Sequence, residues 1–71
     1  MIGLYRHYKG GTYQLWGLGT HTETEELLVI YMDANHPEKI WIRPRNMFFG
    51  TVIVDGKEVP RFELVESYEG L

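Results

Sequence analysis

Two pairs of adjacent turn-forming residues restrict this chain more than any other feature. Gly10-Gly11 separates two short runs rich in strand-forming residues, and Asp55-Gly56 separates two more. Tight hairpin turns need positive φ at their central residues, which Gly-Gly and Asp-Gly pairs adopt easily. Each pair therefore predicts a β-hairpin, and together the two hairpins commit much of a 71-residue chain to antiparallel strands.

Further strand-like runs lie between these hairpins. Leu27–Met32 is apolar at every position, so we expect the most central strand here, with Leu28, Ile30 or their neighbours fully buried. Ile40–Arg43 is followed by proline, which cannot donate to a sheet and therefore ends a strand or lies at an edge. Arg45–Phe49 is expected to form a short helical turn that brings Met47 and a phenylalanine into the core.

The spacing of these runs predicts the fold class. Short strands at close intervals, without a helical period, are typical of an all-β domain. We expect a five- to six-stranded antiparallel barrel of the SH3-like type, with an OB-like or other small open barrel as the alternative. Gly17 and Gly19 predict a bulge or bend in the second strand. Residues 1–66 are expected to form this single domain, and residues 67–71 a frayed tail.

Large aromatic residues compensate for the shortness of the chain. A domain of this size buries only about 60% of the surface that its unfolded chain exposes, but the sequence holds two Trp, five Tyr and three Phe. Cysteine is absent, so no disulfide or thiolate metal site can add stability. Strand alternation cannot bury every ring, so we expect some, but not all, of four rings to reach the surface: Tyr5, Tyr8, Trp16 and Trp41.

The N-terminal and apolar segments indicate the location of the protein. Met1–Arg6 lacks the basic stretch and apolar run of a secretory signal. The longest apolar stretch, Leu27–Met32, is far shorter than the roughly 20 residues that cross a bilayer. We therefore expect a cytoplasmic protein with no membrane partner, and predict no particular oligomeric state.

The sequence lacks a pattern typical of a catalytic or metal site. The only serine, Ser67, lies in the expected tail, so no nucleophile is held in place. The segment from Lys9 to Thr12 is too short for a phosphate loop and opens a strand. The histidines at 7, 21 and 36 lack the paired short spacings of structural zinc. We therefore predict no enzyme activity, no cofactor and no metal; an enzyme ranks third among the function classes.

Five motifs stand out along the chain: Tyr5–Gly11 (YRHYKGG), His21–Thr24 (HTET), Trp41–Pro44 (WIRP) with Met47-Phe48, Asp55-Gly56, and Pro60–Phe62 (PRF). In these motifs, which span residues 3–65, the chain resembles a bacterial family known only as domain of unknown function 1653. It departs from the family's usual pattern at Thr22, where serine is frequent, and at Ala34–Lys39, where a shorter glycine-containing loop is usual. The resemblance implies a compact all-β module, encoded alone or attached to other domains, and implies no activity.

Six residues within these motifs are predicted to form a ligand-binding surface: Arg6, His7, Tyr8, Trp41, Arg43 and Arg61. The three arginines lie inside or at the ends of predicted strands. A guanidinium can hold a carboxylate or phosphate through two parallel hydrogen bonds and can stack on a ring. The alternative is that these arginines pair with glutamates across the sheet and only decorate the barrel; the candidate partners are Glu26, Glu58 and Glu63.

The charge balance ranks two function hypotheses. Seven Lys and Arg face ten Asp and Glu, a formal net charge of −3, whereas nucleic-acid binders usually carry a basic excess. We therefore predict a non-catalytic binding or adaptor module that recognises a protein segment or a small acidic ligand. The alternative is a sequence-tolerant nucleic-acid module, in which rings stack on bases and basic side chains contact phosphates: Arg6, Lys9, Arg43, Arg45 and Arg61.

Overall fold

The computed structural model describes residues 1–69, which form strands and a single turn of helix. The elements are β1 (Gly3–His7), β2 (Thr12–Thr20), β3 (Leu27–Asp33), β4 (His36–Pro44), α1 (Arg45–Phe48), β5 (Thr51–Val54), β6 (Lys57–Pro60) and β7 (Phe62–Ser67). Five strands form one antiparallel sheet in the order β4-β3-β2-β1-β7, and β5 pairs with β6 alone. The predicted antiparallel, mostly β class is confirmed.

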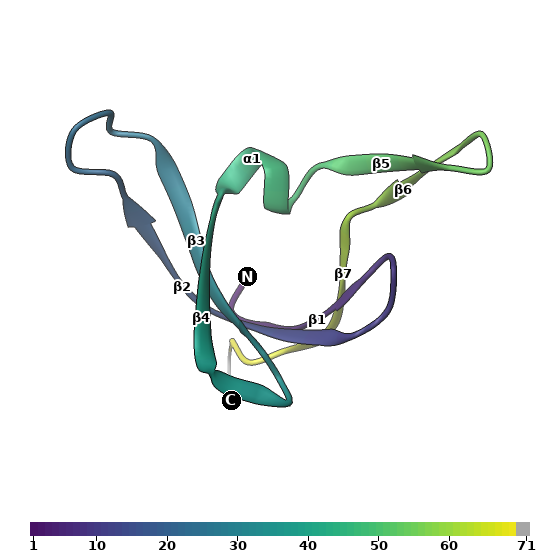
Figure 1. The fold of residues 1–71 in the computed structure, drawn as a ribbon, viewed down its shortest axis with the longest axis horizontal. Coiled ribbons are helices and arrows are strands. Elements are labelled where there is room, and N and C mark those ends of the chain that lie inside the picture. Colours follow the sequence, from purple (N-terminus) through teal and green to yellow (C-terminus); the bar gives the residue numbers. More distant parts are fainter. Residues whose placement is uncertain (70–71) are drawn as a thin grey trace.

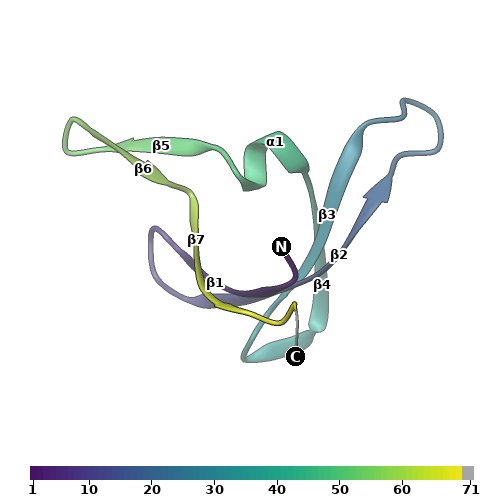
Figure 2. The same cartoon turned by 180° about the vertical axis from the view of Figure 1, so that it is seen from behind.

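The arrangement of the elements leaves two arms projecting from a central body (Figures 1 and 2). One arm is the β5–β6 hairpin, which extends beyond α1. The other is the end of β2 and β3 with its connecting loop, on the opposite side of the molecule. The buried core cluster lies in the central body and includes residues of β1, β2, β3, α1 and β7: Tyr5, Leu15, Tyr31, Phe48 and Phe62.

Both predicted hairpins are confirmed. Asp55 and Gly56 have φ of 52° and 79° and form a two-residue turn between Val54 and its partner Lys57, as the Asp-Gly signal predicts. Between β1 and β2, Gly10 and Gly11 also have positive φ. This second turn is wider than the two residues predicted, because the Gly10 N–H donates to the carbonyl of His7 at 2.8 Å and Tyr8–Gly10 form the loop.

The core is a cluster of rings gathered on one face of the sheet. Phe48 lies in α1 and enters the core, as predicted. It is fully buried and stacks on Phe62 with ring centroids 4.1 Å apart. Tyr5 and Tyr31 meet the Phe48 ring edge-on at 5.3 and 5.1 Å. Met47 is 48% exposed, so the expectation that it enters the core is wrong: a single helical turn directs only one of two adjacent side chains inward.

The position expected for β3 is wrong, whereas the expected burial of Leu28, Ile30 or their neighbours is confirmed at the neighbours. Val29 and Tyr31 are buried, whereas Leu28 and Ile30 are only half-buried. The strand lies second from the edge of the sheet, and β2 is central. An apolar run with no alternation does not specify which set of side chains faces the core, because both sets satisfy the pattern.

The predicted irregularity in β2 is confirmed as a β-bulge. The register with β3 shifts between Leu15 and Gly17, so Trp16 is the extra residue. Leu15 is fully buried, and Trp16 is 63% exposed. The bulge therefore lets β2 bend while its largest ring stays outside the core.

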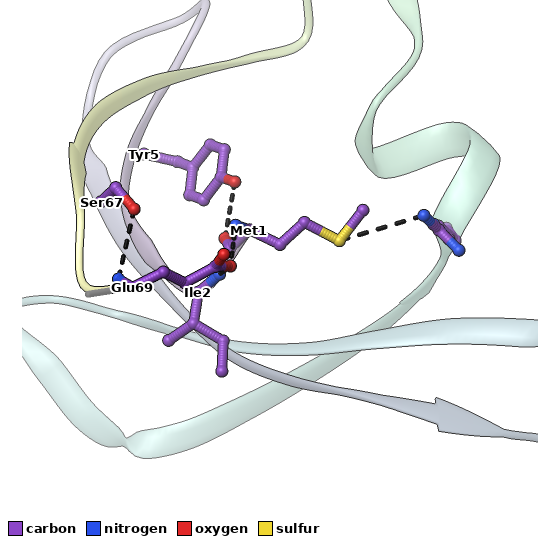
Figure 3. A network of polar contacts seen from close by, with 6 residues as sticks. Met1, Ile2, Tyr5, Ser67 and Glu69 are labelled. Atoms are coloured by element: carbon purple, nitrogen blue, oxygen red, sulfur yellow. Dashed lines mark hydrogen bonds and ion pairs between the residues drawn. The ribbon is translucent and has the colours of Figure 1, made fainter.

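The N-terminus is tied to the end of β7 by a polar network (Figure 3). The Tyr5 hydroxyl donates to the Met1 carbonyl at 2.6 Å. The Glu69 carboxylate accepts hydrogen bonds from the Met1 ammonium group and, at 2.9 Å, from the Ile2 N–H. The Tyr68 N–H donates to the Ile2 carbonyl at 2.9 Å. The predicted tail begins within this network, and its residues 70–71 lie outside the described chain.

This network predicts a loss of stability in acid. Hydrogen bonds from the N-terminal ammonium group and from the Ile2 N–H lower the pKa of Glu69, so the carboxylate form stabilises the fold. That contribution is present at neutral pH and disappears as the pH falls through the lowered pKa. We expect Glu69→Gln to reduce the melting temperature at pH 7 and to make melting less pH-dependent below pH 5, roughly the range where carboxylates protonate. Glu66→Gln is the control; equal pH profiles for wild type and Glu69→Gln would contradict the assignment.

No helix in residues 1–69 is long and apolar enough to span a membrane.

Candidate functional site

One small pocket draws residues from every strand of the five-stranded sheet. It has a volume of about 200 Å³, and we call it the ring pocket. Its lining residues are His7 of β1, Tyr13 of β2, Tyr31 of β3, Trp41 and Arg43 of β4, and Phe62 of β7. The lining side chains lie on the face of the sheet that carries the core, so the ring pocket lies directly over the packed rings.

The strand register brings these side chains together. Tyr31 is paired with Trp41 across β3 and β4, and His7 with Phe62 across β1 and β7. Tyr13 bridges the two pairs, with its ring 5.8 Å from that of Tyr31 and 5.6 Å from that of Phe62. Tyr31 and Phe62 are themselves buried, so the back of the ring pocket is part of the core and is held rigidly.

Two arginines bring positive charge to this apolar surface. The Arg43 guanidinium lies over the Phe62 ring, 5.9 Å from its centroid. Arg61 lies in the bend before β7, which is fixed by backbone hydrogen bonds to Gly50 and Tyr8. The Arg43 Nη1 and Arg61 Nε atoms are buried and have no hydrogen-bond partner within residues 1–69. Such atoms are rare in folded proteins, because a buried N–H without an acceptor loses its hydration without compensation.

No carboxylate of the described chain balances these charges. The ion pairs of residues 1–69 involve the N-terminus, His21 and His36, and none includes an arginine. The predicted pairing of Arg43 and Arg61 with Glu26, Glu58 or Glu63 is therefore not seen there. Arg43 and Arg61 form a local positive site in a chain of net charge −3.

The titration of two neighbouring side chains reflects this local charge. Burial lowers the pKa of His7, and the positive charges of Arg43, Arg61 and Lys9 lower it further. Burial raises the pKa of Tyr31, an effect opposed by the charge of Arg43 and by a side-chain hydrogen bond from Arg43, whose Nη1 atom nevertheless lacks a partner. The His7 Nδ1 atom accepts the Lys9 backbone N–H at 3.1 Å, so the proton of the neutral imidazole lies on Nε2. At neutral pH His7 therefore adds a neutral N–H donor to this surface.

The structure divides the six residues predicted from the sequence. His7, Trp41 and Arg43 line the ring pocket, and Arg61 is close enough for its charge to act on His7. Tyr8 is outside it, with its ring tilted against that of His7 at 4.7 Å. Arg6 is exposed and is paired with Glu63 in the register of β1 and β7. Its side chain leaves the opposite face from those of Tyr5 and His7, because successive residues of a strand alternate.

Three residues that line the ring pocket were not predicted from the sequence, namely Tyr13, Tyr31 and Phe62. Tyr31 and Phe62 are buried in the core, and Tyr13 packs against it. The only signal that could have identified them is cross-strand pairing with Trp41 and His7, which requires the register of distant strands.

Two hollows larger than the ring pocket also lie on the described surface. A groove of about 330 Å³ runs between β1 and the β5–β6 arm and includes Arg6 and Tyr8. A larger, mostly apolar hollow of about 520 Å³ lies beside α1 and includes Met1, Leu27 and Phe49. Within residues 1–69, no three His, Asp or Glu side chains come together as metal ligands would.

Comparison with known proteins agrees with the motifs in the sequence. The profile of the family described as "Protein of unknown function (DUF1653)" matches residues 3–64. The crystal structure of a DUF1653 protein from Bordetella bronchiseptica is 35% identical and superposes with a TM-score of 0.79, covering 92% of this chain and 86% of that one. No curated protein gives a significant match. The family profile covers most of the chain, and the chain therefore belongs to the DUF1653 family.

Proposed function

We propose that this protein is a non-catalytic binding module whose ring pocket holds the anionic group of an acidic ligand. The observation that carries the proposal is the pair of buried arginine N–H groups, on Arg43 and Arg61, without acceptors in residues 1–69. A carboxylate or phosphate oxygen would supply the missing acceptors. Hydrogen bonds between ionised groups are about twice as strong as neutral ones.

The folded protein differs in free energy between the empty and the occupied ring pocket. Leaving a buried N–H of a charged group without a partner costs about 1–3 kcal/mol or more, and this structure carries two such groups. A fold that retains this cost gains free energy when an anion reaches these donors. His7 contributes a third donor without adding charge.

The size of the ring pocket limits what can enter it. A volume of about 200 Å³ is below the range of about 300–1,000 Å³ typical of sites for drug-sized ligands. The pocket therefore suits one charged group and its immediate attachment. That group belongs either to a small acidic ligand or to one side chain of a protein segment.

We further propose that the five-stranded sheet is a small barrel of the SH3-like type, with an OB-like or other open barrel as the alternative. Phe48 follows the edge strand β4, and Phe62 begins the opposite edge strand β7, yet their rings stack 4.1 Å apart. The two edges of the sheet are thus joined through the core. The one-turn helix before the last strands also favours the SH3-like type.

Calorimetric titration with inorganic phosphate and with acetate tests the proposed function. We expect saturable binding of phosphate to the wild-type protein, and a loss of about tenfold or more in affinity for Arg43→Gln, since one hydrogen bond to a charged group contributes about 1.5–3 kcal/mol. Arg6→Gln is the matched control, because that arginine lies on the opposite face, and it should bind like the wild type. NMR should also show the pKa of His7 rising when phosphate binds, because an anion offsets the arginine charges.

Equal binding by Arg43→Gln and the wild type, or no saturable binding at millimolar phosphate, would contradict the proposal. The nucleic-acid alternative predicts a different result. The logarithm of the affinity for short single-stranded RNA would then fall linearly with the logarithm of the salt concentration, with a slope that corresponds to several phosphate contacts. Arg6→Gln would also weaken RNA binding as much as Arg43→Gln.

A further inference from the structure

We propose that the ligand of the ring pocket is a single aromatic ring that carries a phosphate group. This inference rests on the proposed function and specifies its ligand: the phosphate meets Arg43 and Arg61, and the ring lies against Trp41. Three features of the described residues support it: the rings of the lining, the position of Trp41, and the excess of positive charge.

The lining is unusually rich in planar rings. Of its six residues, all but Arg43 carry an aromatic or imidazole ring. A pocket for a bare phosphate or an aliphatic acid has no need of such walls. Aromatic pairs in edge-to-face or offset geometry gain free energy beyond the burial of their area, so these walls favour an aromatic ligand.

Trp41 differs from the other rings of the pocket. His7, Tyr13, Tyr31 and Phe62 are linked to one another by ring contacts with centroids 4.9–6.2 Å apart. Trp41 lines the same pocket but contacts none of them at such distances within residues 1–69, and it is 46% exposed. A ligand ring in the pocket would give Trp41 the aromatic partner that the other four rings already have.

The charge at the site favours phosphate over carboxylate. Arg43 lines the pocket, the charges of Arg43 and Arg61 both act on His7 in its wall, and the Lys39 ammonium lies 5.8 Å from the centroid of the Trp41 ring. A phosphate monoester carries about −1.5 to −2 charges at pH 7 and three acceptor oxygens, whereas a carboxylate carries one charge. Two guanidinium groups with separate unpartnered N–H atoms match the dianion better.

The size of the ring pocket restricts the ring itself. About 200 Å³ accommodates one ring and its substituent, and a complete nucleotide would extend well outside. The shared chemistry is therefore a monocyclic aryl phosphate. It could come from a free metabolite or from a phosphorylated tyrosine side chain of a protein.

Calorimetry measures separately what the aromatic ring, the charge and the phosphate group of the ligand contribute to the affinity. The four probes are phenyl phosphate, cyclohexyl phosphate, inorganic phosphate and benzoate. Phenyl phosphate and cyclohexyl phosphate have the same charge and similar size, so their ratio measures the aromatic preference. We expect phenyl phosphate to bind about three- to tenfold more tightly than cyclohexyl phosphate, the gain typical of one aromatic pair. It should also bind more tightly than inorganic phosphate and benzoate.

Trp41→Leu should reduce the ratio of the phenyl to the cyclohexyl affinity towards one, because it removes the ring against which the phenyl group lies. Trp16→Leu is the matched control, because Trp16 is exposed in the bulge of β2 and does not line the pocket. An unchanged ratio in Trp41→Leu would overturn the assignment of the ring to Trp41.

The outcomes separate this inference from the proposed function. If the wild type binds phenyl and cyclohexyl phosphate with equal affinity, or binds benzoate more tightly than phenyl phosphate, the aryl phosphate inference is overturned. The proposed function still stands in that case, provided that inorganic phosphate binds. No binding of any probe would overturn both. A phosphotyrosine with blocked termini identifies the source: tighter binding than phenyl phosphate supports a protein segment, and weaker binding supports a free aryl phosphate.

Discussion

Phe48→Ala is expected to lower the free energy of unfolding by about 3–5 kcal/mol, the usual cost of removing a buried phenylalanine. Phe48 has no exposed surface, stacks on Phe62, and contacts Tyr5 and Tyr31 edge-on. It also joins α1 to β7 through the Phe62 ring, so its loss removes that contact. Domains of this size have a total stability near the lower end of about 5–15 kcal/mol, so much of the variant should be unfolded at 37 °C.

Urea denaturation measures this change through the shift in midpoint. Met47→Ala is the matched control, because Met47 precedes Phe48 in the same helical turn and is exposed. We expect it to change the unfolding free energy by less than about 1 kcal/mol. A loss of similar size for both variants would mean that α1 contributes through its backbone and that Phe48 is not the centre of the core.

Arg43→Met is expected to abolish phosphate binding and, without ligand, to raise the free energy of unfolding by about 1 kcal/mol. Methionine preserves an unbranched side chain that can cover the Phe62 ring. It removes the buried Nη1 atom that lacks an acceptor. It also removes a positive charge that acts on the same site as Arg61. A gain in stability with a loss of binding is typical of functional residues whose environment is not optimal for folding.

Added phosphate should reverse this order of stability. Ligand that binds only the folded state stabilises it by RT ln(1 + [L]/Kd), so phosphate should raise the melting temperature of the wild type and leave that of Arg43→Met unchanged. Arg6→Met, on the opposite face, should respond to phosphate like the wild type. If Arg43→Met instead lowers the unfolding free energy by more than about 1 kcal/mol, Arg43 is a structural residue that covers Phe62.

Local sequence signals predicted the parts of the fold that depend on a few neighbouring residues. The positive φ values at Gly10, Gly11, Asp55 and Gly56 follow from turn chemistry. The helical turn at Arg45–Phe48 follows a proline that ends the preceding strand. These features could be predicted because the conformational preference of each residue agrees with the fold around it.

Features that depend on pairing between distant strands could not be predicted in the same way. For Leu27–Met32 the buried set of side chains could not be chosen between Leu28 and Ile30 and their neighbours, because an apolar run does not reveal its register. In the candidate site, Arg43 and Trp41 were found through one short motif. Their partner Tyr31 lies on another strand, and Phe62 lies on the opposite edge of the sheet. Arg6 was grouped with them by its motif, although strand alternation directs it to the other face.

NMR observation of the arginine side-chain N–H groups tests the central claim most directly, because it detects the two unpartnered donors themselves. On titration with inorganic phosphate, we expect the Arg61 Nε–H and Arg43 Nη–H resonances to shift downfield. They should saturate together, at the dissociation constant found by calorimetry. The Nε–H resonances of Arg6 and Arg45 should not move. If all four arginines shift by similar amounts without saturation, phosphate contacts the surface non-specifically and the ring pocket is not an anion site.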